Sequence, residues 1–258
     1  MSNLTSKNPN KNVRKWLLAG AAAVIIGLLL WGVSWATYAR PPLPESVEAL
    51  RSDDQVIVTQ DPWLTFSPAT DTVDTGFIFY PGGRVDPKGY ASLMREIASE
   101  GYLVVVPEMP INMAVFNPNI ADEITAYYPE IESWVIGGHS VGGTMAAQYT
   151  GDHPETVGGL VIWASYPAGS ADISGFNIPV ASIYGSNDPA VNDTSVGERV
   201  HLLPEKTQYI RIEGGDHHQF GSYEVNPAEH HAAISRESQH EQIIRATLEI
   251  LQQISQQE

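Results

Sequence analysis

Apolar residues are distributed along the chain in one long run followed by many short ones. The long run occupies residues 16–39, WLLAGAAAVIIGLLLWGVSWATYA, and contains no charged residue. After residue 50, short apolar runs rich in β-branched residues predict strands, and segments with helical periodicity separate most of them. The predicted strands are 56–59, 63–67, 76–80, 102–106, 134–137, 159–164, 180–184 and 208–212. The predicted helices are 88–99, 121–128, 142–149, 196–203 and 235–253. Two strands in succession, followed by alternation of strands and helices, predict an α/β fold with a mostly parallel sheet covered on both faces.

The apolar run at 16–39 predicts a transmembrane helix. At about 1.5 Å per residue, a helix of this length covers the roughly 30 Å hydrocarbon core of a bilayer. Four basic residues precede the run and one follows it, which predicts a cytoplasmic N-terminus at residues 1–15 and a single-pass signal anchor in the cell membrane. A proline-rich linker at 40–50 and an extracytoplasmic folded domain at 51–258 would follow.

Two other interpretations of this run remain open. A cleaved signal peptide usually has a shorter apolar stretch that ends in a small-x-small site. The small residues Ser34, Ala36 and Ala39 could form such a site. The second alternative is a buried core helix, which the uniform hydrophobicity and the basic flank argue against.

The charge balance excludes some classes of partner. The 258 residues contain 14 Lys and Arg against 30 Asp and Glu, a formal net charge of −16. The first forty residues carry five basic residues and no acid, so the remainder is more acidic still. Such a chain lacks the basic face that binds nucleic acid, and we expect no nucleic-acid partner. We also expect the acidic domain to stand away from anionic lipid headgroups on its proline-rich linker. The absence of cysteine excludes disulfides and thiolate nucleophiles.

The clearest chemical motif is Gly138-His139-Ser140-Val141-Gly142, between a predicted strand and a predicted helix. A G-x-S-x-G pattern at this junction predicts a sharp turn that presents the serine hydroxyl. Glycine is expected two residues before and after the serine, because side chains there would collide. The N–H of Val141, at the helix start, would point to the position where an oxyanion develops.

A serine nucleophile requires a base and an orienting acid, and the sequence offers both after later strands. Asp188 follows the strand at 180–184, and His217 follows the strand at 208–212. His218 is adjacent, and spacing alone does not choose between the two histidines. The order Ser, Asp, His along the chain predicts a catalytic triad of Ser140, Asp188 and His217. The roles of His218, His230 and His231 stay open. No helical H-x-x-x-H spacing occurs, and we expect neither a metal nor a cofactor.

The strand at 76–80 is followed by Pro81-Gly82-Gly83-Arg84. A glycine pair at this position lets the backbone approach a reacting carbonyl and donate a second N–H to the oxyanion. Pro81 has no N–H, so Gly82 or Gly83, or the adjacent Arg84, is the expected donor. A phosphate-binding loop is the competing interpretation, but the lysine that such loops carry is absent.

With these elements in place, the chain resembles the α/β-hydrolases, and more narrowly the small bacterial membrane-anchored or exported serine hydrolases related to dienelactone hydrolases. The matching stretches are FYPGGRVDP, EMPINMAVFNPN, VIGGHSVGG, VIWASYPA, SIYGSND and IEGGDHHQFGSY. The resemblance covers residues from about 50 onward. It implies Ser140 as nucleophile, Asp188 as acid and His217, by its position before Gln-Phe-Gly, as base. Dienelactone hydrolases proper carry a cysteine nucleophile, and this chain has serine instead.

The expected reaction is acyl transfer from a small-molecule ester to water. About fifteen residues separate the strands at 159–164 and 180–184, too few for a lid domain. We expect an open pocket lined by Met113, Phe116, Trp163 and Tyr166. A carboxylesterase acting on small or medium esters fits such a pocket. A peptidase, amidase or thioesterase with the same triad, and a catalytically silent binding module, are the alternatives. The sequence does not indicate the oligomeric state.

Overall fold

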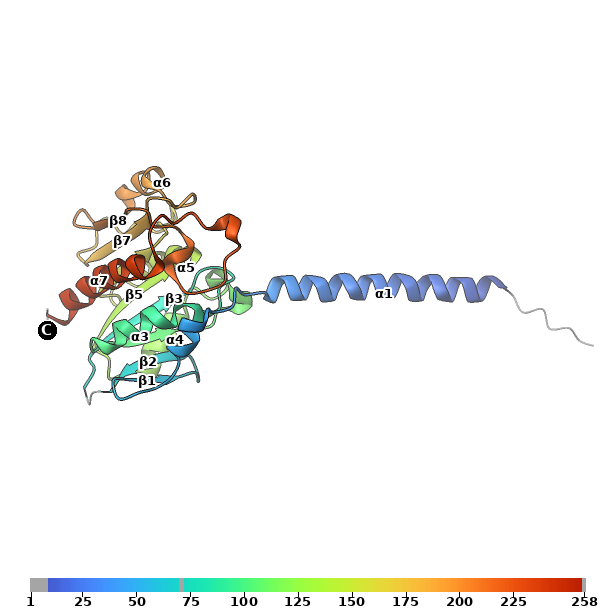
Figure 1. Cartoon of the computed structure of the whole chain (residues 1–258), viewed down its shortest axis with the longest axis horizontal. Helices are drawn as coiled ribbons and strands as arrows, with labels where there is room; N and C mark the ends of the chain where they lie inside the picture. The colour runs from blue at the N-terminus through green and yellow to red at the C-terminus, as the bar shows by residue number, and fades with distance from the viewer. Residues whose placement is uncertain (1–8, 70–71, 257–258) are drawn as a thin grey trace, which may run out of the picture. The chain divides into compact units, whose positions relative to one another are not determined.

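The computed structural model describes residues 9–69 and 72–256. The chain divides into two compact units, Met1–Tyr38 and Ala39–Glu258 (Figure 1). Residues 1–8, which belong to the predicted cytoplasmic N-terminus, lie outside the described residues.

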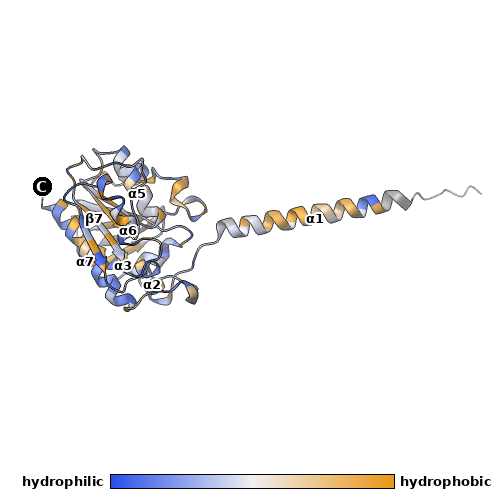
Figure 2. Ribbon diagram, turned by 90° about the horizontal axis from the view of Figure 1, so that it is seen from above, coloured by the Kyte–Doolittle hydropathy of each residue, from blue (hydrophilic) through white to orange (hydrophobic). Residues whose placement is uncertain are grey.

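The first unit consists of one helix, α1 (Pro9–Thr37). Its segment Val13–Trp35 is apolar apart from Arg14 and Lys15 near its start, and none of it is buried within the structure (Figure 2). The helix begins earlier than the predicted residue 16. It is long and apolar enough to cross a membrane, a property shared by membrane anchors and signal sequences. The third interpretation, a buried core helix, is wrong because its large side chains are exposed on every side.

The second unit is built on an eight-stranded sheet with the order β1-β2-β4-β3-β5-β6-β7-β8. The strands are β1 (Val56–Thr59), β2 (Leu64–Pro68), β3 (Thr75–Tyr80), β4 (Leu103–Val106), β5 (Ser133–His139), β6 (Gly159–Trp163), β7 (Val180–Gly185) and β8 (Gln208–Ile212). β2 is antiparallel to β1 and to β4, and every other pairing is parallel. The predicted mostly parallel sheet is therefore confirmed, with each strand within two residues of its predicted ends.

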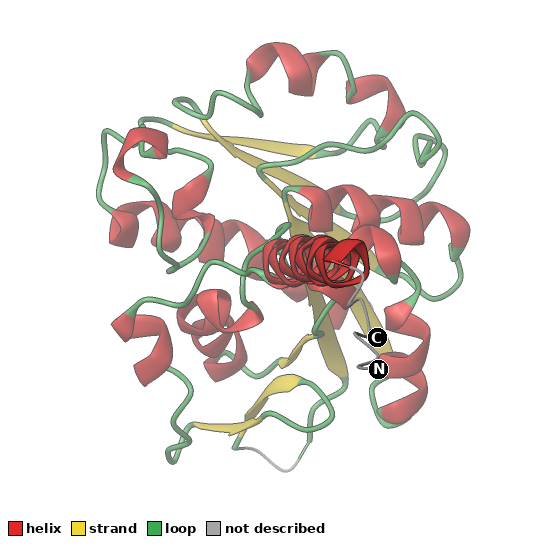
Figure 3. Cartoon of the chain, turned by 90° about the vertical axis from the view of Figure 1, so that its right-hand side faces the viewer, coloured by secondary structure: helices red, strands yellow, loops and turns green. Residues whose placement is uncertain are grey.

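Helices cover both faces of the sheet (Figure 3). They are α2 (Pro44–Glu48), α3 (Ala91–Ser99), α4 (Ile120–Tyr127), α5 (Val141–Asp152), α6 (Asp193–Gly197) and α7 (Arg236–Ser255). Short 3-10 turns include η1 (Pro87–Tyr90), η2 (Pro110–Asn112), η3 (Ala114–Phe116), η4 (Val200–Leu202), η5 (His218–Phe220) and η6 (Pro227–Glu229). The predicted helix 196–203 is instead the separate α6 and η4.

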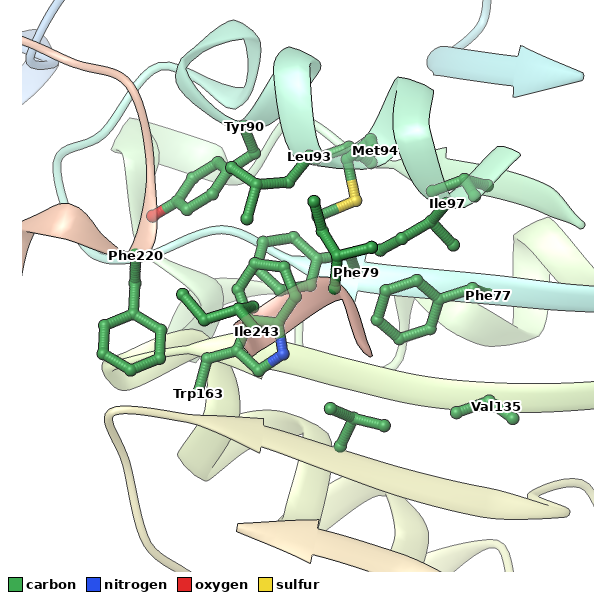
Figure 4. Packing of buried hydrophobic residues seen from close by; sticks show 14 of the residues in the cluster. Phe77, Phe79, Tyr90, Leu93, Met94, Ile97, Val135, Trp163, Phe220 and Ile243 are labelled. Carbon is green, nitrogen blue, oxygen red and sulfur yellow. The ribbon is translucent and has the colours of Figure 1, made fainter. Parts of the chain in front are cut away.

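Alternation along the strands produces two hydrophobic cores. On β3, Phe77 and Phe79 point into the core shared with α3 and α7, and Ile78 and Tyr80 point into the core shared with α4 and α5. Such alternation follows from the two-residue period of a strand. Figure 4 shows the first core, where aromatic rings of the strands meet the aliphatic side chains of α3. Its helical side chains include Leu93, Met94, Ile97 and Ile243.

The segment expected to be a linker, residues 40–50, is part of the second unit. Arg40 forms a backbone bridge with Val85, and Pro42 forms one with Tyr223. Residues 44–48 form α2, which was not predicted. The proline rings do not keep this segment apart, because the backbone groups between them find partners in the domain. Proline at the first turn of α2 is compatible with a helix start.

The connection between β6 and β7 is short. All of residues 164–179 are described, and none of them lies in a helix. The expectation of a domain without a lid at this position agrees with the connection seen. The carboxyl ends of β3, β5, β7 and β8 are where the chain places its candidate chemistry, as expected for an open α/β sheet.

Candidate active site

Ser140 occupies a strained turn between β5 and α5. Its φ is 53° and its ψ is −125°, a conformation that residues with a side chain rarely adopt. The turn is held from both sides, because the Ser140 N–H donates to the carbonyl of Trp163 at 2.9 Å and the Ser165 hydroxyl donates to the Ser140 carbonyl at 2.6 Å. The surrounding strands thus fix a backbone geometry that would not persist in an isolated peptide.

The two glycines that flank this turn are required by close backbone contacts. A Cβ on Gly142 would lie 2.2 Å from the carbonyl oxygen of Tyr80, and one on Gly138 would lie 2.5 Å from the carbonyl carbon of Gly142. Both distances are far below van der Waals contact, and backbone atoms cannot move away as a flexible side chain could. The steric reason given for the G-x-S-x-G spacing therefore holds in this chain.

Asp188 and His217 meet at the carboxyl ends of β7 and β8. The His217 Nδ1 lies 2.7 Å from Asp188 Oδ2, and the Asp188 side chain is fully buried. The second carboxylate oxygen, Oδ1, accepts hydrogen bonds from the N–H groups of Ala190 and Val191 at 2.7 and 2.9 Å. The carboxylate is thereby fixed in place, and its bond to Nδ1 leaves Nε2 of His217 as the nitrogen that can accept a proton.

The neighbouring His218 points elsewhere. Its Nδ1 lies 3.4 Å from the hydroxyl of Tyr223. The loop that carries both histidines is organised by the buried Asp216, whose carboxylate accepts N–H bonds from Gln219, His231 and Ala232. The structure therefore places His217, rather than His218, against the acid.

Ser140 and His217 line one cavity of about 100 Å³. The other residues around it are Arg40, Gly82, Gly83, Val85, His139, His218 and Tyr223. The serine and the histidine come from loops after β5 and β8, so the fold brings chain segments 77 residues apart to one small space. Arg40 also forms an ion pair with Glu229 at 2.8 Å.

A buried series of hydrogen bonds connects the loop at residues 81–84, here called the glycine loop, with the backbone of His217. The His139 Nε2 lies 3.0 Å from the His217 carbonyl, so this nitrogen carries the proton and donates. His139 Nδ1 must then accept, and it lies 2.8 Å from the Tyr90 hydroxyl. The Tyr90 oxygen in turn accepts from the N–H of Gly82 at 3.0 Å. The direction of every bond in the chain is set by the two backbone groups at its ends.

Burial keeps the side chains of His139 and Tyr90, the two rings in this series of hydrogen bonds, uncharged. Burial, and then the nearby His217 and His218, lower the pKa of His139 well below its ordinary value. Burial raises the pKa of Tyr90 well above its ordinary value. Both shifts arise because a charged form would be desolvated. The pKa of His218 is also lowered, first by burial and then by His217 and Arg40.

The bond from Gly82 to Tyr90 changes the expectation for the oxyanion donors. Because the Gly82 N–H is already committed to a buried hydroxyl, it does not point at a reacting group. Gly83 lies next to the turn, since a Cβ on it would be 3.1 Å from the side chain of Val141. Val141 is the first residue of α5, and an N–H in the first turn of a helix has no partner within that helix.

The four residues expected to line the pocket lie in different surroundings. Trp163 is fully buried and packs between Phe79 and Phe220, as Figure 4 shows, so it is a core residue. Tyr166 packs beside Arg199 and does not line the cavity. Met113 contacts the glycine loop, because a Cβ on Gly83 would lie 2.9 Å from its sulfur. The remaining residue, Phe116, is 59% exposed.

Three residues of this region were missed by the sequence reasoning. His139 could have been noticed, because it is the last residue of a buried strand and immediately precedes the turn. Tyr90 carries no local signal, since its hydroxyl reaches the loop only through the packing of η1. Arg40 was assigned to a linker, and its place at the cavity depends on two backbone bridges that no periodicity reveals.

Comparison with known proteins identifies the family. Residues 76–241 match the model of the Alpha/beta hydrolase family. The chain belongs to this family. A comparison with curated proteins found no match.

Several solved structures resemble this α/β hydrolase. A candidate dienelactone hydrolase from Klebsiella pneumoniae subsp. pneumoniae superposes with a TM-score of 0.57 at 16% identity, covering 74% of this chain and 92% of that one. A predicted CIB-like hydrolase from Thermoplasma acidophilum gives 0.54 at 19% identity, covering 77% and 98%. The α/β hydrolase MGS-MChE2, from a sediment metagenome of the Mar Chica lagoon in Morocco, gives 0.52 at 18% identity, covering 65% and 91%. At these identities the similarity shows the fold alone.

Proposed function

We propose that this α/β hydrolase is a serine hydrolase that cleaves small or medium carboxylic esters through an acyl-enzyme. Ser140 Oγ attacks the ester carbonyl while His217 Nε2 takes its proton, and Asp188 orients the imidazole and stabilises its charged form. The N–H groups of Val141 and Gly83 bind the oxyanion of the tetrahedral intermediate. His217 then protonates the leaving alcohol, and water releases the acyl group by the same steps.

One observation carries this proposal. The 2.7 Å contact between His217 Nδ1 and Asp188 Oδ2 lies at the cavity that Ser140 lines from its strained turn. A surface histidine and a turn aspartate would have no reason to meet in a buried contact beside that particular hydroxyl. The cavity of about 100 Å³ favours a short acyl group over a long chain. The Gly82–Tyr90–His139 hydrogen bonds would hold the oxyanion loop and the base at a fixed separation.

Covalent labelling tests the nucleophile. We expect a fluorophosphonate probe to label the folded wild type, because such probes phosphonylate an activated serine hydroxyl. Ser140→Ala should abolish labelling, whereas Ser170→Ala, at an exposed serine of the β6–β7 connection, should retain it. Labelling that survives in Ser140→Ala contradicts the assignment. A folded wild type that is never labelled favours a silent binding module.

The type of acyl substrate is tested by turnover. We expect p-nitrophenyl acetate and butyrate to be hydrolysed faster than the octanoate, because the cavity is small. Amide, peptide and thioester substrates in parallel assays distinguish the esterase from an amidase, peptidase or thioesterase with the same residues. Ser140→Ala serves as the blank for each substrate.

We also propose that α1 is retained as a single-pass anchor, with the N-terminus in the cytoplasm and the catalytic domain on the other side. The long apolar stretch and the basic residues before it support this orientation. Mass spectrometry of the protein purified from membranes would detect residues 1–39 if the anchor is retained. Recovery of a form that starts near residue 40 would show that the segment is a cleaved signal peptide.

A further inference from the structure

The loop at residues 109–119 exposes apolar side chains beside the candidate active site. Ile111, Val115 and Phe116 are 45%, 42% and 59% exposed, and they lie on the successive turns η2 and η3. None of residues 109–119 carries a charge, although the domain as a whole is strongly acidic. An exposed apolar group of this kind is typical of an interaction surface.

The backbone holds this loop outward at a conformational cost. Ile111 has a φ of 45° and Asn112 a φ of 56°, both in the left-handed region, which is unfavourable for a β-branched residue such as isoleucine. The conformation is fixed by hydrogen bonds, since the Asn112 N–H donates to the Met109 carbonyl at 2.8 Å and its carbonyl accepts from the Arg84 N–H at 2.7 Å. Strain that presents an apolar side chain to solvent points to a function.

Backbone hydrogen bonds link Asn112 to Arg84 and Arg84 to Arg40, which lies close to the end of α1 along the chain; these three residues are called the hydrogen-bonded strip. The Arg40 N–H donates to the Arg84 carbonyl at 2.7 Å, so Arg40 and Asn112 both bond to one residue. Only Tyr38 and Ala39 separate Arg40 from Thr37, the last residue of α1. Three peptide steps of about 3.8 Å place Arg40 within about 11 Å of the helix end. This limit follows from chain length alone and holds for any orientation of α1.

We propose that the loop at 109–119 docks on the membrane that α1 crosses, with Ile111, Val115 and Phe116 inserted between lipid headgroups. This inference rests on the proposed membrane anchor. A loop tied to the first residues after the anchor cannot move far from the bilayer surface. The cavity lies in the same region, because Arg40 lines it and Met113 contacts the Gly83 loop. The active site thus opens close to the bilayer, where it meets amphiphilic esters dissolved in the membrane.

Local charge permits this contact even though the domain is acidic. Asn112 of the loop bonds to Arg84, and Arg84 bonds to Arg40. The charge of Arg40 is balanced by its ion pair with Glu229. A loop without charged side chains avoids the repulsion that acidic groups would meet at anionic headgroups. The nearest acid along the chain is Glu108, which precedes the loop. Apolar side chains that insert between lipid headgroups are stabilised because they are removed from water.

The absence of cysteine in the wild-type chain allows a single-site test. The full-length protein would be placed in phosphatidylcholine nanodiscs with one engineered cysteine carrying an NBD fluorophore. Val115→Cys reports on the loop, and Val200→Cys is its matched control, at an equally exposed valine on η4. Gly27→Cys reports on α1, where an added side chain meets nothing within 4 Å. Lipids brominated near the headgroup quench fluorophores that lie in the bilayer interface, and lipids brominated towards the end of the acyl chain quench fluorophores near the bilayer centre, where position 27 would lie; both kinds are used.

We expect a blue shift and quenching at positions 27 and 115 and neither at position 200. Phe116→Cys should repeat the result of Val115→Cys if the first label perturbs the loop. Quenching at 27 with none at 115 and 116 overturns the membrane docking while the anchor stands. Absence of quenching at 27 overturns the anchor, and the docking with it. Equal quenching at 115 and 200 also overturns the proposal, because it means that the label rather than the loop seeks the lipid. Fluorophosphonate labelling of the same samples reports separately on the proposed catalytic function.

Discussion

Removing the hydroxyl of Tyr90 should destabilise the domain more than most tyrosine-to-phenylalanine changes. Tyr90 is fully buried. Its hydroxyl oxygen accepts a hydrogen bond from the Gly82 N–H, and its O–H donates a hydrogen bond to His139 Nδ1. Tyr90→Phe leaves both of these buried polar groups without a partner. Each unsatisfied buried group costs about 1–3 kcal/mol, so the free energy of unfolding should fall by about 2–6 kcal/mol.

Thermal unfolding provides the measurement. For a domain of this size, each kcal/mol shifts Tm by roughly 2–4 °C, so even the lower limit corresponds to a Tm about 4 °C or more below the wild type. The matched control is Tyr184→Phe, whose hydroxyl donates to the exposed carboxylate of Asp193. That carboxylate can bind water instead, and we expect a loss of about 1 kcal/mol or less.

Activity should fall together with stability in Tyr90→Phe. The Gly82 N–H loses its partner, so the loop that carries the proposed oxyanion donor Gly83 becomes less fixed. We expect kcat to decrease at a temperature where the variant is still folded, while Tyr184→Phe keeps its kcat. A Tyr90→Phe protein as stable and as active as the wild type would refute the hydrogen-bond chain as described.

Three further predictions concern the elements around the site. Asp188→Asn should lower kcat by about 10³–10⁴-fold with the fold retained, because the imidazole loses its orientation and the charge that stabilises it; circular dichroism and ester turnover test both parts. Gly142→Ala should lower the free energy of unfolding, measured by chemical denaturation, by about 3 kcal/mol or more, because the added Cβ would lie 2.2 Å from the Tyr80 carbonyl oxygen. In the same helix, Gly151→Ala should be neutral or stabilising, because its nearest contact would be 3.5 Å. Burial lowers the pKa of His240 to about 4, so below pH 6.5 the unfolded chain binds a proton that the folded chain does not. Stability should therefore fall with falling pH, and at pH 5 His240→Gln should avoid about 2 kcal/mol of that loss; equal pH dependence in both proteins would contradict this.

The centre of the sheet could be predicted from sequence because the strands β3 to β7 are buried on both faces. Such strands are short, apolar and β-branched, and turns separate them clearly. The predicted helix at 196–203 was less successful, because Gly197 lies in its interior and the segment there divides into α6 and η4. The spacing of apolar residues does not reveal this break, because Val196 of α6 and Leu202 of η4 are both buried.

The geometry of the candidate site was predictable where it depends on local backbone conformation and on chain order, whereas the catalytic roles of its residues remain predictions. The turn at Ser140 follows from glycine spacing, and Asp188 and His217 follow from their places after strands. The commitment of Gly82 to Tyr90 could not be read in the same way, because it depends on how η1 packs against β3. Trp163 illustrates the same limit, since an aromatic residue at a strand end can face either the core or the cavity.

The two bridges that tie residues 40–42 to the domain decide where a soluble fragment can begin. A fragment that starts at residue 51, the boundary suggested by composition, would lack α2 and would leave Glu229 without its guanidinium partner. It would also remove one wall of the cavity. A fragment that starts at residue 39 keeps all of these contacts and discards the apolar helix. A protease that removes the helix and keeps these contacts must therefore cut within two or three residues, and it leaves a new positively charged terminus beside the cavity that Arg40 and Ser140 line.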